Sequence, residues 1–308
     1  QYISGNRCER GLGKTKNENG IPNLYEWKLK RLFDYEALDA DKAPRGTVGI
    51  PRVLNMYENY PFWATFFHRL GYRVVLSPPS NHRLYELGIE SIPSESECYP
   101  AKLAHGHVAW LIHQGVDFIF YPALFYERNE IKNADNHYNC PIVTSYSENI
   151  RNNVDEISDG TVKFRNPFLA FTDLGTVVEG LEKEFCHTEN DAERYAYTVD
   201  NKCDRSAYLS EAAGKPGWYW EHPFTSEEIK TAAAEGWAEL SAVHKEVEEK
   251  GIETLKYMEE HHVHGIVLAG RPYHIDPEIN HGIPEMINSY GIAVLSEDSI
   301  SNLAEPER

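Results

Sequence analysis

The chain has 308 residues, of which 41% are hydrophobic and 12% aromatic, and its formal net charge is −18. This composition is typical of a globular protein of about two domains and argues against a disordered chain. The negative charge argues against nucleic acid or an anionic membrane surface as the main partner and favours small molecules or proteins. No run approaches the roughly 18 consecutive apolar residues of a membrane-spanning helix, and no charged-then-apolar leader opens the chain, so we expect a cytoplasmic protein.

Both ends of the sequence predict a piece of a longer chain. The first residue is Gln1 rather than Met, and residues 291–300 form an apolar, strand-like stretch with nothing after it to pack against. Residues 1–45 are polar and irregular apart from one expected short helix at 24–33. We therefore interpret 1–45 as an N-terminal extension and not as a domain.

Residues 46–150 alternate between apolar strands and amphipathic helices. In the first helix Trp63, Phe67 and Leu70 follow the i, i+4, i+7 spacing of a core-facing stripe. The alternation predicts the α/β class, with a Rossmann-like, doubly wound parallel sheet whose ligands gather at the carboxyl ends of the strands. We expect strands at 47–54, 72–79 and 116–124, a strand with a polar turn at 140–150, and helices at 61–71, 82–88 and 100–115.

The second half of the chain changes character. Residues 151–262 are rich in acidic and helix-favouring residues and predict a helical insertion, with one long helix at 226–251. Residues 263–308 return to strand, loop, helix and strand. This pattern predicts the start of a second α/β domain.

Cysteine usage favours reduced thiols or metal ligands, because five scattered cysteines do not make the dense disulfide framework of a small secreted domain. Cys98 lies at or just before the N-terminus of the helix that Pro100 begins. The partial positive charge of that end stabilises a thiolate or an anionic iron-sulfur cluster, whereas Glu95 and Glu97 oppose a negative sulfur. A buried, inert core cysteine is the alternative interpretation.

Cys140 and Cys8 are the other candidate metal ligands. Cys140 follows a polar loop and directly precedes an apolar run, and Cys8 lies between arginines that favour an anionic sulfur. A structural thiol at Cys140 and an exposed thiol in a flexible arm at Cys8 are the alternatives. Cys186 and Cys203 show no ligand spacing, and we expect both to be structural.

Three thiolates from separate loops suit a 4Fe-4S cluster with one iron left without a cysteine. The same thiols together with His105 or His137 also allow a zinc site. The sequence has no C-x-x-C pair, Walker A loop, G-x-G-x-x-G or G-x-S-x-G motif, which argues against the corresponding redox, nucleotide and hydrolase sites.

The predicted second domain offers a candidate anion site. Arg271 and His274 lie in the loop between the strand and a helix expected from about Pro277, an arrangement that can bind a phosphate or coenzyme A. Asp276 and Glu278 weaken this interpretation, because they are better explained as complements of the helix dipole.

Four segments carry a family resemblance: residues 4–11, 93–107, 139–150 and 269–287. Together they resemble the uncharacterised region that follows the ATP-dependent activase domains in long bacterial CoA-substrate-specific enzyme activases, which are 2-hydroxyglutaryl-CoA dehydratase activator-related proteins. That region is in turn similar to the cluster-carrying subunits of (R)-2-hydroxyacyl-CoA dehydratases. The resemblance spans nearly the whole chain, and the segments occur in the family's order.

The resemblance implies Rossmann-like domains, a 4Fe-4S cluster held by three cysteines, an acyl-CoA thioester substrate and an activase that spends ATP to inject a low-potential electron. Cys98 and Cys140 match the first two cluster cysteines of the dehydratases. The third comes late in the dehydratases, whereas this chain has no cysteine after Cys203. Either the third ligand lies outside this sequence, or Cys8 replaces it, or no cluster is held.

Two functional hypotheses follow. In the first, the chain is an iron-sulfur redox component that accepts electrons from an ATP-dependent activase, expected in the same parent polypeptide, and acts on or passes electrons towards an acyl-CoA-type substrate. In the second, it is a non-catalytic scaffold that docks the activase or presents coenzyme A without a cluster of its own. The activase's ATP-binding motifs are absent from the sequence, so we expect no ATP hydrolysis by this chain.

Overall fold

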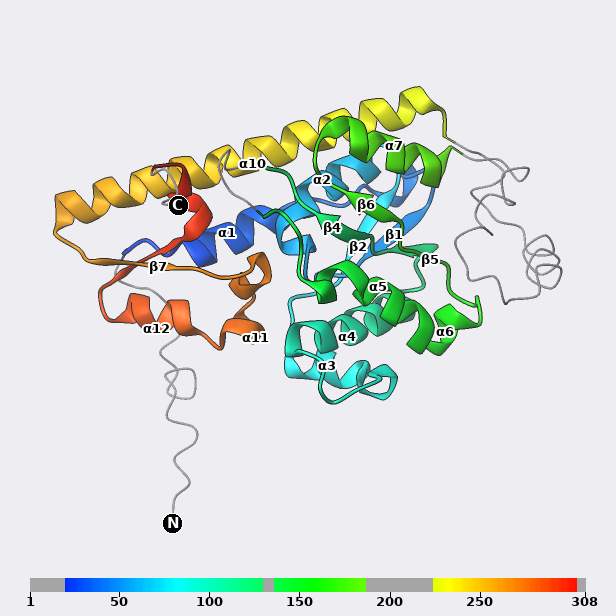
Figure 1. Cartoon of the computed structure of the whole chain (residues 1–308), viewed down its shortest axis with the longest axis horizontal. Helices are drawn as coiled ribbons and strands as arrows, with labels where there is room; N and C mark the ends of the chain where they lie inside the picture. The colour runs from blue at the N-terminus through cyan, green and yellow to red at the C-terminus, as the bar shows by residue number, and fades with distance from the viewer. Residues whose placement is uncertain (1–19, 130–135, 187–223, 304–308) are drawn as a thin grey trace, which may run out of the picture.

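The computed structural model describes residues 20–129, 136–186 and 224–303 (Figure 1). Its largest sheet has four strands in the order β2-β1-β3-β5, and every neighbouring pair is parallel. Helices lie on both sides of this sheet, which confirms the predicted Rossmann-like α/β class. The strands are β1 (Thr47–Ile50), β2 (Arg73–Leu76), β3 (Phe118–Phe120) and β5 (Phe164–Arg165).

Figure 1 shows α2, α7 and α10 along one side of the sheet and α4 and α5 along the other. The helices around the sheet are α2 (Met56–Arg69), α3 (His82–Leu87), α4 (Tyr99–Gln114), α5 (Pro141–Asn153), α6 (Asp155–Ser158), α7 (Leu174–Phe185) and α10 (Ser226–His261).

The strand expected at 116–124 is broken into two. After β3 the chain passes through Tyr121 and Pro122 and continues as β4 (Ala123–Tyr126), which pairs in parallel with β6 (Phe168–Ala170). Backbone bonds on both sides of the break, from Tyr121 N to Arg165 O and from Ala123 N to Pro167 O, keep the two strand pairs in line.

Residues 140–150 form helix α5, so the strand predicted there is wrong. Pro141 occupies the first helical position, where its missing N–H costs nothing. The buried residues Val143, Tyr146 and Ile150 recur at helical spacing, and this periodicity overrides the strand-like appearance of the Ile142–Val143 pair.

The segment 151–262 contains the expected helices, including a long one that begins at Ser226 and runs beyond the predicted end to His261. It also contains β5 and β6, which complete the sheets beside β3 and β4. Strands of two and three residues are too short to show a periodic pattern, so the sequence gives no sign of them. The domain boundaries themselves stay a prediction.

The last described part is a smaller parallel pair, β7 (Gly265–Leu268) with β8 (Ala293–Ser296). Two short helices, α11 (Pro277–Asn280) and α12 (Ile283–Ser289), lie between these strands in the chain. On its other side β8 is bridged by Asn23, which also caps helix α1 (Leu24–Phe33). Helix α1 therefore packs beside β8.

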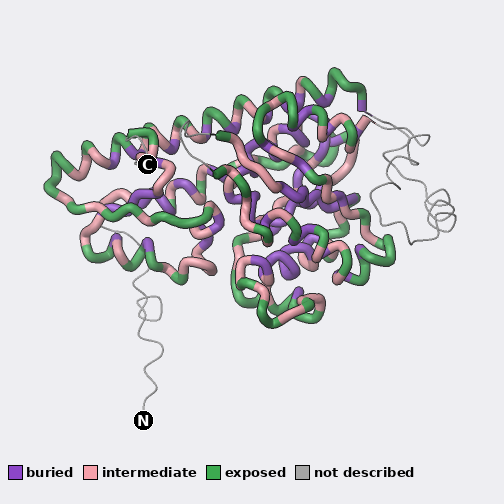
Figure 2. Tube along the Cα trace, viewed as in Figure 1, coloured by how far each residue is buried: buried purple, intermediate pink, exposed green. Residues whose placement is uncertain are grey.

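Buried residues concentrate around the larger sheet (Figure 2). Trp63 is fully buried and packs against Phe120 of β3 with ring centroids 4.7 Å apart. Phe67 and Leu70, the other members of the predicted stripe, are also buried. The predicted core face of α2 is thus confirmed.

Helix α10 runs along the four-stranded sheet and on past the β7–β8 pair (Figure 1). With 36 residues it is about 54 Å long at 1.5 Å per residue. Two glycines allow close approach of neighbouring backbone: a Cβ at Gly236 would lie 2.9 Å from Phe62 O, and one at Gly251 would lie 1.9 Å from Ser299 O. One rigid helix therefore contacts both α2 and the segment that follows β8.

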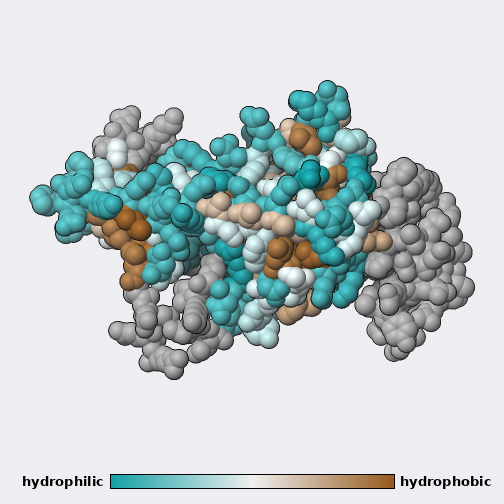
Figure 3. All heavy atoms as spheres, turned by 90° about the horizontal axis from the view of Figure 1, so that it is seen from above, coloured by the Kyte–Doolittle hydropathy of each residue, from teal (hydrophilic) through white to brown (hydrophobic). Residues whose placement is uncertain are grey.

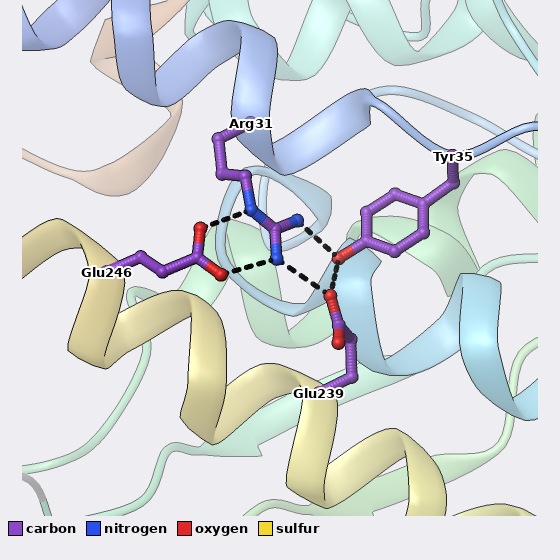
Figure 4. A network of polar contacts seen from close by, with 4 residues as sticks. All are labelled: Arg31, Tyr35, Glu239 and Glu246. Atoms are coloured by element: carbon purple, nitrogen blue, oxygen red, sulfur yellow. Dashed lines mark hydrogen bonds and ion pairs between the residues drawn. The ribbon is translucent and has the colours of Figure 1, made fainter.

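Arg31 joins α1 to α10 through a charged network (Figure 4). Its Nε donates to Glu246 at 2.6 Å, and its Nη2 donates to Glu239 at 2.9 Å. Tyr35 donates to the same Glu239 at 2.6 Å. The hydrogen bond from Arg31 lowers the pKa of Glu246.

Within the described residues, no helix is both long and apolar enough to span a membrane. Seen from the side along which α10 runs, the surface is mostly hydrophilic, with small apolar patches (Figure 3). This agrees with the excess of acidic residues.

Replacing Arg31 by alanine should lower the free energy of unfolding by about 1–2 kcal/mol, because two glutamates lose their shared partner while solvent screens part of the effect. Urea denaturation at pH 7 measures the change. Lys30→Ala is the matched control, because Lys30 pairs with the exposed Glu26 and its loss should matter little.

The same pair of proteins gives a pH test. A lowered pKa means that Glu246 adds stability above its ordinary pKa of 4.5 and loses it as the pH falls through the folded-state value. The difference between wild type and Arg31→Ala should therefore shrink below about pH 4.5. A difference that is equal at pH 7 and pH 3 contradicts this account.

Candidate functional site

Cys98 and Cys140 occupy equivalent positions at the starts of two helices. Cys98 is the N-cap of α4, as predicted, and Cys140 is the N-cap of α5. Their backbone angles are nearly identical, with φ and ψ of −66° and 148° for Cys98 and −64° and 152° for Cys140. Each is followed by a proline within the first two helical positions, so both sulfurs lie where a helix N-terminus stabilises negative charge.

The two thiols differ in exposure and bonding. Cys98 is exposed and its sulfur caps no backbone N–H. Cys140 is half-buried, and its sulfur accepts a hydrogen bond from Val143 N at 3.4 Å. Solvent or a ligand therefore reaches the sulfur of Cys98 more readily than that of Cys140.

Two buried tyrosines are sensitive to both cysteines. Burial first, then Cys140 and Cys98, raise the pKa of Tyr273 to about 12. Burial also raises the pKa of Tyr121, with Tyr146, Cys140 and Cys98 as additional causes. Both cysteines therefore lie on the side of the larger sheet to which Tyr121 and Tyr273 belong.

The hydroxyl of Tyr121 is unpaired. Tyr121 is 0% exposed, and its hydroxyl has no hydrogen-bond partner among the described residues. A buried, unpaired hydroxyl costs about 1–3 kcal/mol.

His105 follows Cys98 in α4, and both of its ring nitrogens already have hydrogen-bond partners, so neither is free for a metal. Its Nε2 and the Tyr146 hydroxyl are 3.0 Å apart, and its Nδ1 and Ser91 Oγ are 2.7 Å apart. Burial lowers its pKa to about 4, so the ring is neutral near pH 7. This arrangement argues against His105 as the zinc ligand considered from sequence.

Arg271 and His274 flank Tyr273 in the chain. Arg271 is exposed, and its charge partly offsets the rise in the pKa of Tyr273. The Nδ1 of His274 accepts from Arg271 N at 3.2 Å. Burial and Arg271 lower the pKa of His274.

The helix expected from Pro277 is present as α11, and Asp276 is its N-cap. The Oδ1 of Asp276 accepts from Glu278 N at 2.9 Å, which confirms its interpretation as a complement of the helix end. Because the carboxylate of Asp276 already caps the N-terminus of α11, the exposed Arg271 is the better binding group for an anion.

Asp276 also has a role that the sequence did not predict. It is 1% exposed, and its Oδ2 accepts hydrogen bonds from Tyr57 of α2 and from Ser80, which follows β2. Its backbone N–H donates to Tyr273 O at 3.2 Å. The carboxylate thus anchors the turn that carries Tyr273 to the carboxyl edge of the larger sheet.

The network continues to His107 of α4. Because Ser80 donates to Asp276, it accepts from His107 Nε2 at 3.0 Å. The Nδ1 of His107 then accepts from Ser77, whose oxygen accepts in turn from Arg52 N at 2.7 Å. Burial and Arg52 lower the pKa of His107 to about 3, which keeps the ring neutral.

This order of groups differs from that of a nucleophilic triad. Both ring nitrogens of His107 are hydrogen-bonded to serines. The carboxylate of Asp276 accepts a hydrogen bond from Ser80 and not from the imidazole. The network therefore serves to position the loops at the sheet edge.

Among the described residues no group of three or more His, Cys, Asp or Glu side chains forms a metal-ligand constellation. Cys8 lies outside them, as does Cys203. Cys186 ends α7, and burial with nearby glutamates raises its pKa to about 11. A thiol that stays protonated fits the structural role expected of Cys186.

Residues 47–300, more than half of the chain, match a family model described as the CoA enzyme activase uncharacterised domain. The match includes Cys98, Cys140 and the Asp276 network, whereas Cys8 precedes it. No curated protein matches the chain. No solved structure matches it.

Replacing Asp276 by alanine should lower the free energy of unfolding by about 2–4 kcal/mol, because the buried hydroxyl of Tyr57 and the half-buried hydroxyl of Ser80 lose their acceptor. Urea denaturation followed by tryptophan fluorescence measures the change. Glu285→Ala, on an exposed position of α12, is the control and should cost less than about 0.5 kcal/mol. Equal, small effects of the two substitutions would show that the carboxylate does not anchor the turn.

Proposed function

The chain belongs to the CoA enzyme activase-related family, and on that premise we propose that it is an iron-sulfur redox component. In this proposal it accepts electrons from an ATP-dependent activase and acts on, or passes electrons towards, an acyl-CoA-type substrate. The observation that carries the proposal is the equivalent placement of Cys98 and Cys140 as the N-caps of α4 and α5.

The chemistry of the donor set fits such a cluster. Thiolates are the usual ligands of iron-sulfur clusters, and helix N-termini with hydroxyl donors favour a group that carries negative charge. Hard cations such as Mg²⁺ and Ca²⁺ prefer oxygen ligands, which the cysteine pair does not supply. When bound, the cluster would supply one-electron transfer, with an iron lacking a cysteine ligand as the place for a thioester oxygen.

The residues would have distinct parts in this proposal. Cys98 and Cys140 would be thiolate ligands of the cluster, and Cys8, which lies outside the described residues, would supply the third thiolate. Arg271 and His274 would contact the phosphate groups of coenzyme A, and the Asp276 network holds the turn that carries Tyr273.

The scaffold hypothesis stays the alternative, because the described residues supply two thiolates and no third ligand. In that case the same surface docks the activase or presents coenzyme A without a cluster. The two functions differ in one measurable property, the binding of iron and sulfide.

The full chain, purified without oxygen and reconstituted with iron and sulfide, should bind iron with a visible thiolate-to-iron absorption band. Cys98→Ser and Cys140→Ser should each abolish its retention on a desalting column, because a serine oxygen is a harder ligand that does not replace a thiolate on iron. Cys186→Ser is the matched control and should retain wild-type iron, because its thiol lies at the C-terminal end of α7 and stays protonated.

Cys8→Ser tests the third ligand in the same assay. Elemental analysis of iron, zinc and sulfide separates a cluster from a zinc site. Wild-type protein that binds neither metal but still binds coenzyme A would favour the scaffold.

Arg271→Ala should weaken binding of coenzyme A by about tenfold, the loss expected for one charge-assisted hydrogen bond to phosphate. Calorimetric titration of wild type and variant with coenzyme A measures it. Arg69→Ala removes an equally exposed arginine at the far end of α2 and should leave the affinity unchanged. Equal losses in both variants would reduce the effect to general charge.

A further inference from the structure

The loop that joins β1 to α2, residues 51–55, carries an arginine without a counter-ion. Arg52 is half-buried, and its Nε atom is buried. Its guanidinium makes no hydrogen bond or ion pair with any described residue. A charge taken out of water is costly unless an opposite charge and hydrogen bonds satisfy it, so this cation requires a partner.

The groups nearest to the guanidinium do not pair with it. Its Cζ atom lies 4.3 Å from the centroid of the Phe33 ring, so the ring covers one face. Burial lowers the pKa of Arg52, and the charges of Tyr57, Tyr60 and Asp276 only partly offset the decrease. Both oxygens of Asp276 already accept hydrogen bonds from other groups. Because the N–H groups of an arginine lie in the plane of the guanidinium, the ring contact leaves them available.

The same loop ends at a second unsatisfied side chain. Asn55 is 3% exposed, and neither its Oδ1 nor its Nδ2 has a partner among the described residues. The residue before it, Leu54, has a φ of 45°, a left-handed conformation that is uncommon outside glycine and that concentrates at functional sites. The loop therefore holds a buried amide, which offers both donors and an acceptor, without a partner.

The backbone at the start of α2 is satisfied, in contrast to these side chains. The N–H groups of residues 56 and 57 donate to the carbonyls of Val53 and Leu54, and those of residues 58 and 59 donate to Asn55 O. A ligand at this loop would therefore be bound by side chains and not by the helix N-terminus.

The loop lies where a doubly wound sheet binds its ligands. In the order β2-β1-β3-β5, the chain leaves β1 for a neighbour on one side and later returns to its other side. The carboxyl end of β1 is thus the point at which the strand order reverses, and ligands bind outside such a point. Arg52 N donates to Ser77 Oγ at 2.7 Å, which holds the loop beside the end of β2.

An oxyanion has the chemistry that these groups lack. A carboxylate or phosphate supplies negative charge and acceptor atoms to a guanidinium, whereas water supplies no charge and a metal cation would be repelled. The chain has 48 acidic and 30 basic residues, so acidic partners are plentiful, yet none in the described part pairs with Arg52. An anion from outside the chain would supply the missing charge.

We propose that the loop 51–55 binds the oxyanion group, a carboxylate or a phosphate, of a small molecule, with Arg52 as its charge partner and Asn55 as its hydrogen-bond partner. The site uses neither the cysteines nor Arg271. The inference therefore does not rest on the proposed iron-sulfur function, and a chain that binds no iron would leave it standing.

The test measures the thermal midpoint of the full chain against the concentration of sodium phosphate and, separately, of sodium acetate. Sodium chloride keeps the ionic strength constant, and the rise in midpoint gives the affinity. The variants are Arg52→Gln and Asn55→Ala, which removes no capping hydrogen bond. Arg69→Gln removes the same charge from an exposed position, and Arg271→Gln removes it from the other candidate anion site.

The midpoint of the wild type should rise with at least one of the two anions, and the anion with the larger effect identifies the group that the site prefers. Arg52→Gln should weaken that affinity about tenfold or more, and Asn55→Ala about threefold. Without anion, Arg52→Gln should melt no lower than the wild type, because an unpaired charge is removed. Arg69→Gln and Arg271→Gln should keep the wild-type affinity.

Four results would overturn the proposal. Neither anion stabilises the wild type, or Arg69→Gln weakens the affinity as much as Arg52→Gln does, which reduces the effect to general charge. Alternatively, Arg271→Gln loses the affinity while Arg52→Gln keeps it, which moves the anion to the other loop. Finally, Arg52→Gln melts lower than the wild type and keeps its anion affinity, which makes Arg52 a purely structural cation.

Discussion

The buried carboxylate of Asp276 couples the two parts of this molecule. Its side chain accepts from Tyr57 and Ser80 at the carboxyl edge of the larger sheet, and its backbone N–H holds the turn of Tyr273. A carboxylate without solvent is costly unless its oxygens are satisfied, so these loops must meet in one arrangement. That arrangement places the turn of Tyr273 at the carboxyl edge of the larger sheet.

Charges of both signs surround the two cysteines. Cys98 and Cys140 cap two helix N-termini, which favour negative charge. Glu97 directly precedes Cys98, and Glu278 accepts a hydrogen bond from Tyr99 at 3.0 Å. The helix ends therefore supply the local attraction for a compact anionic group in a chain whose net charge of −18 repels large polyanions.

Local signals predicted half of the candidate site. Pro100 and the helical periodicity after it placed Cys98 at a helix start, because capping and proline preferences act over one turn. The same Cys–Pro signal stands at Cys140 and Pro141, yet the adjoining apolar residues favoured a strand. The helical spacing of Val143, Tyr146 and Ile150 was the better guide.

Other features depend on contacts that are distant in the sequence. The hydroxyl of Tyr121 is buried without a partner among the described residues, and the hydrogen bond from Ser80 to Asp276 joins residues 196 positions apart. Residues 164–165 and 168–170 become strands because β3 and β4 offer free edges, not because of their own pattern. No periodicity or spacing contains this information.

The close contact of α10 at Gly251 has a mechanical consequence for the turn that carries Tyr273. The β7–β8 pair is attached to the rest of the molecule at three separate places. Ser299 lies against Gly251, Asp276 accepts hydrogen bonds at the edge of the larger sheet, and Asn23 pairs with β8. Asn23 caps α1, and Arg31 of α1 binds α10. With only two attachments, the β7–β8 pair could still rotate about the line that joins them. A third attachment off that axis opposes the rotation, so the turn that carries Tyr273 is held at one position on the edge of the larger sheet.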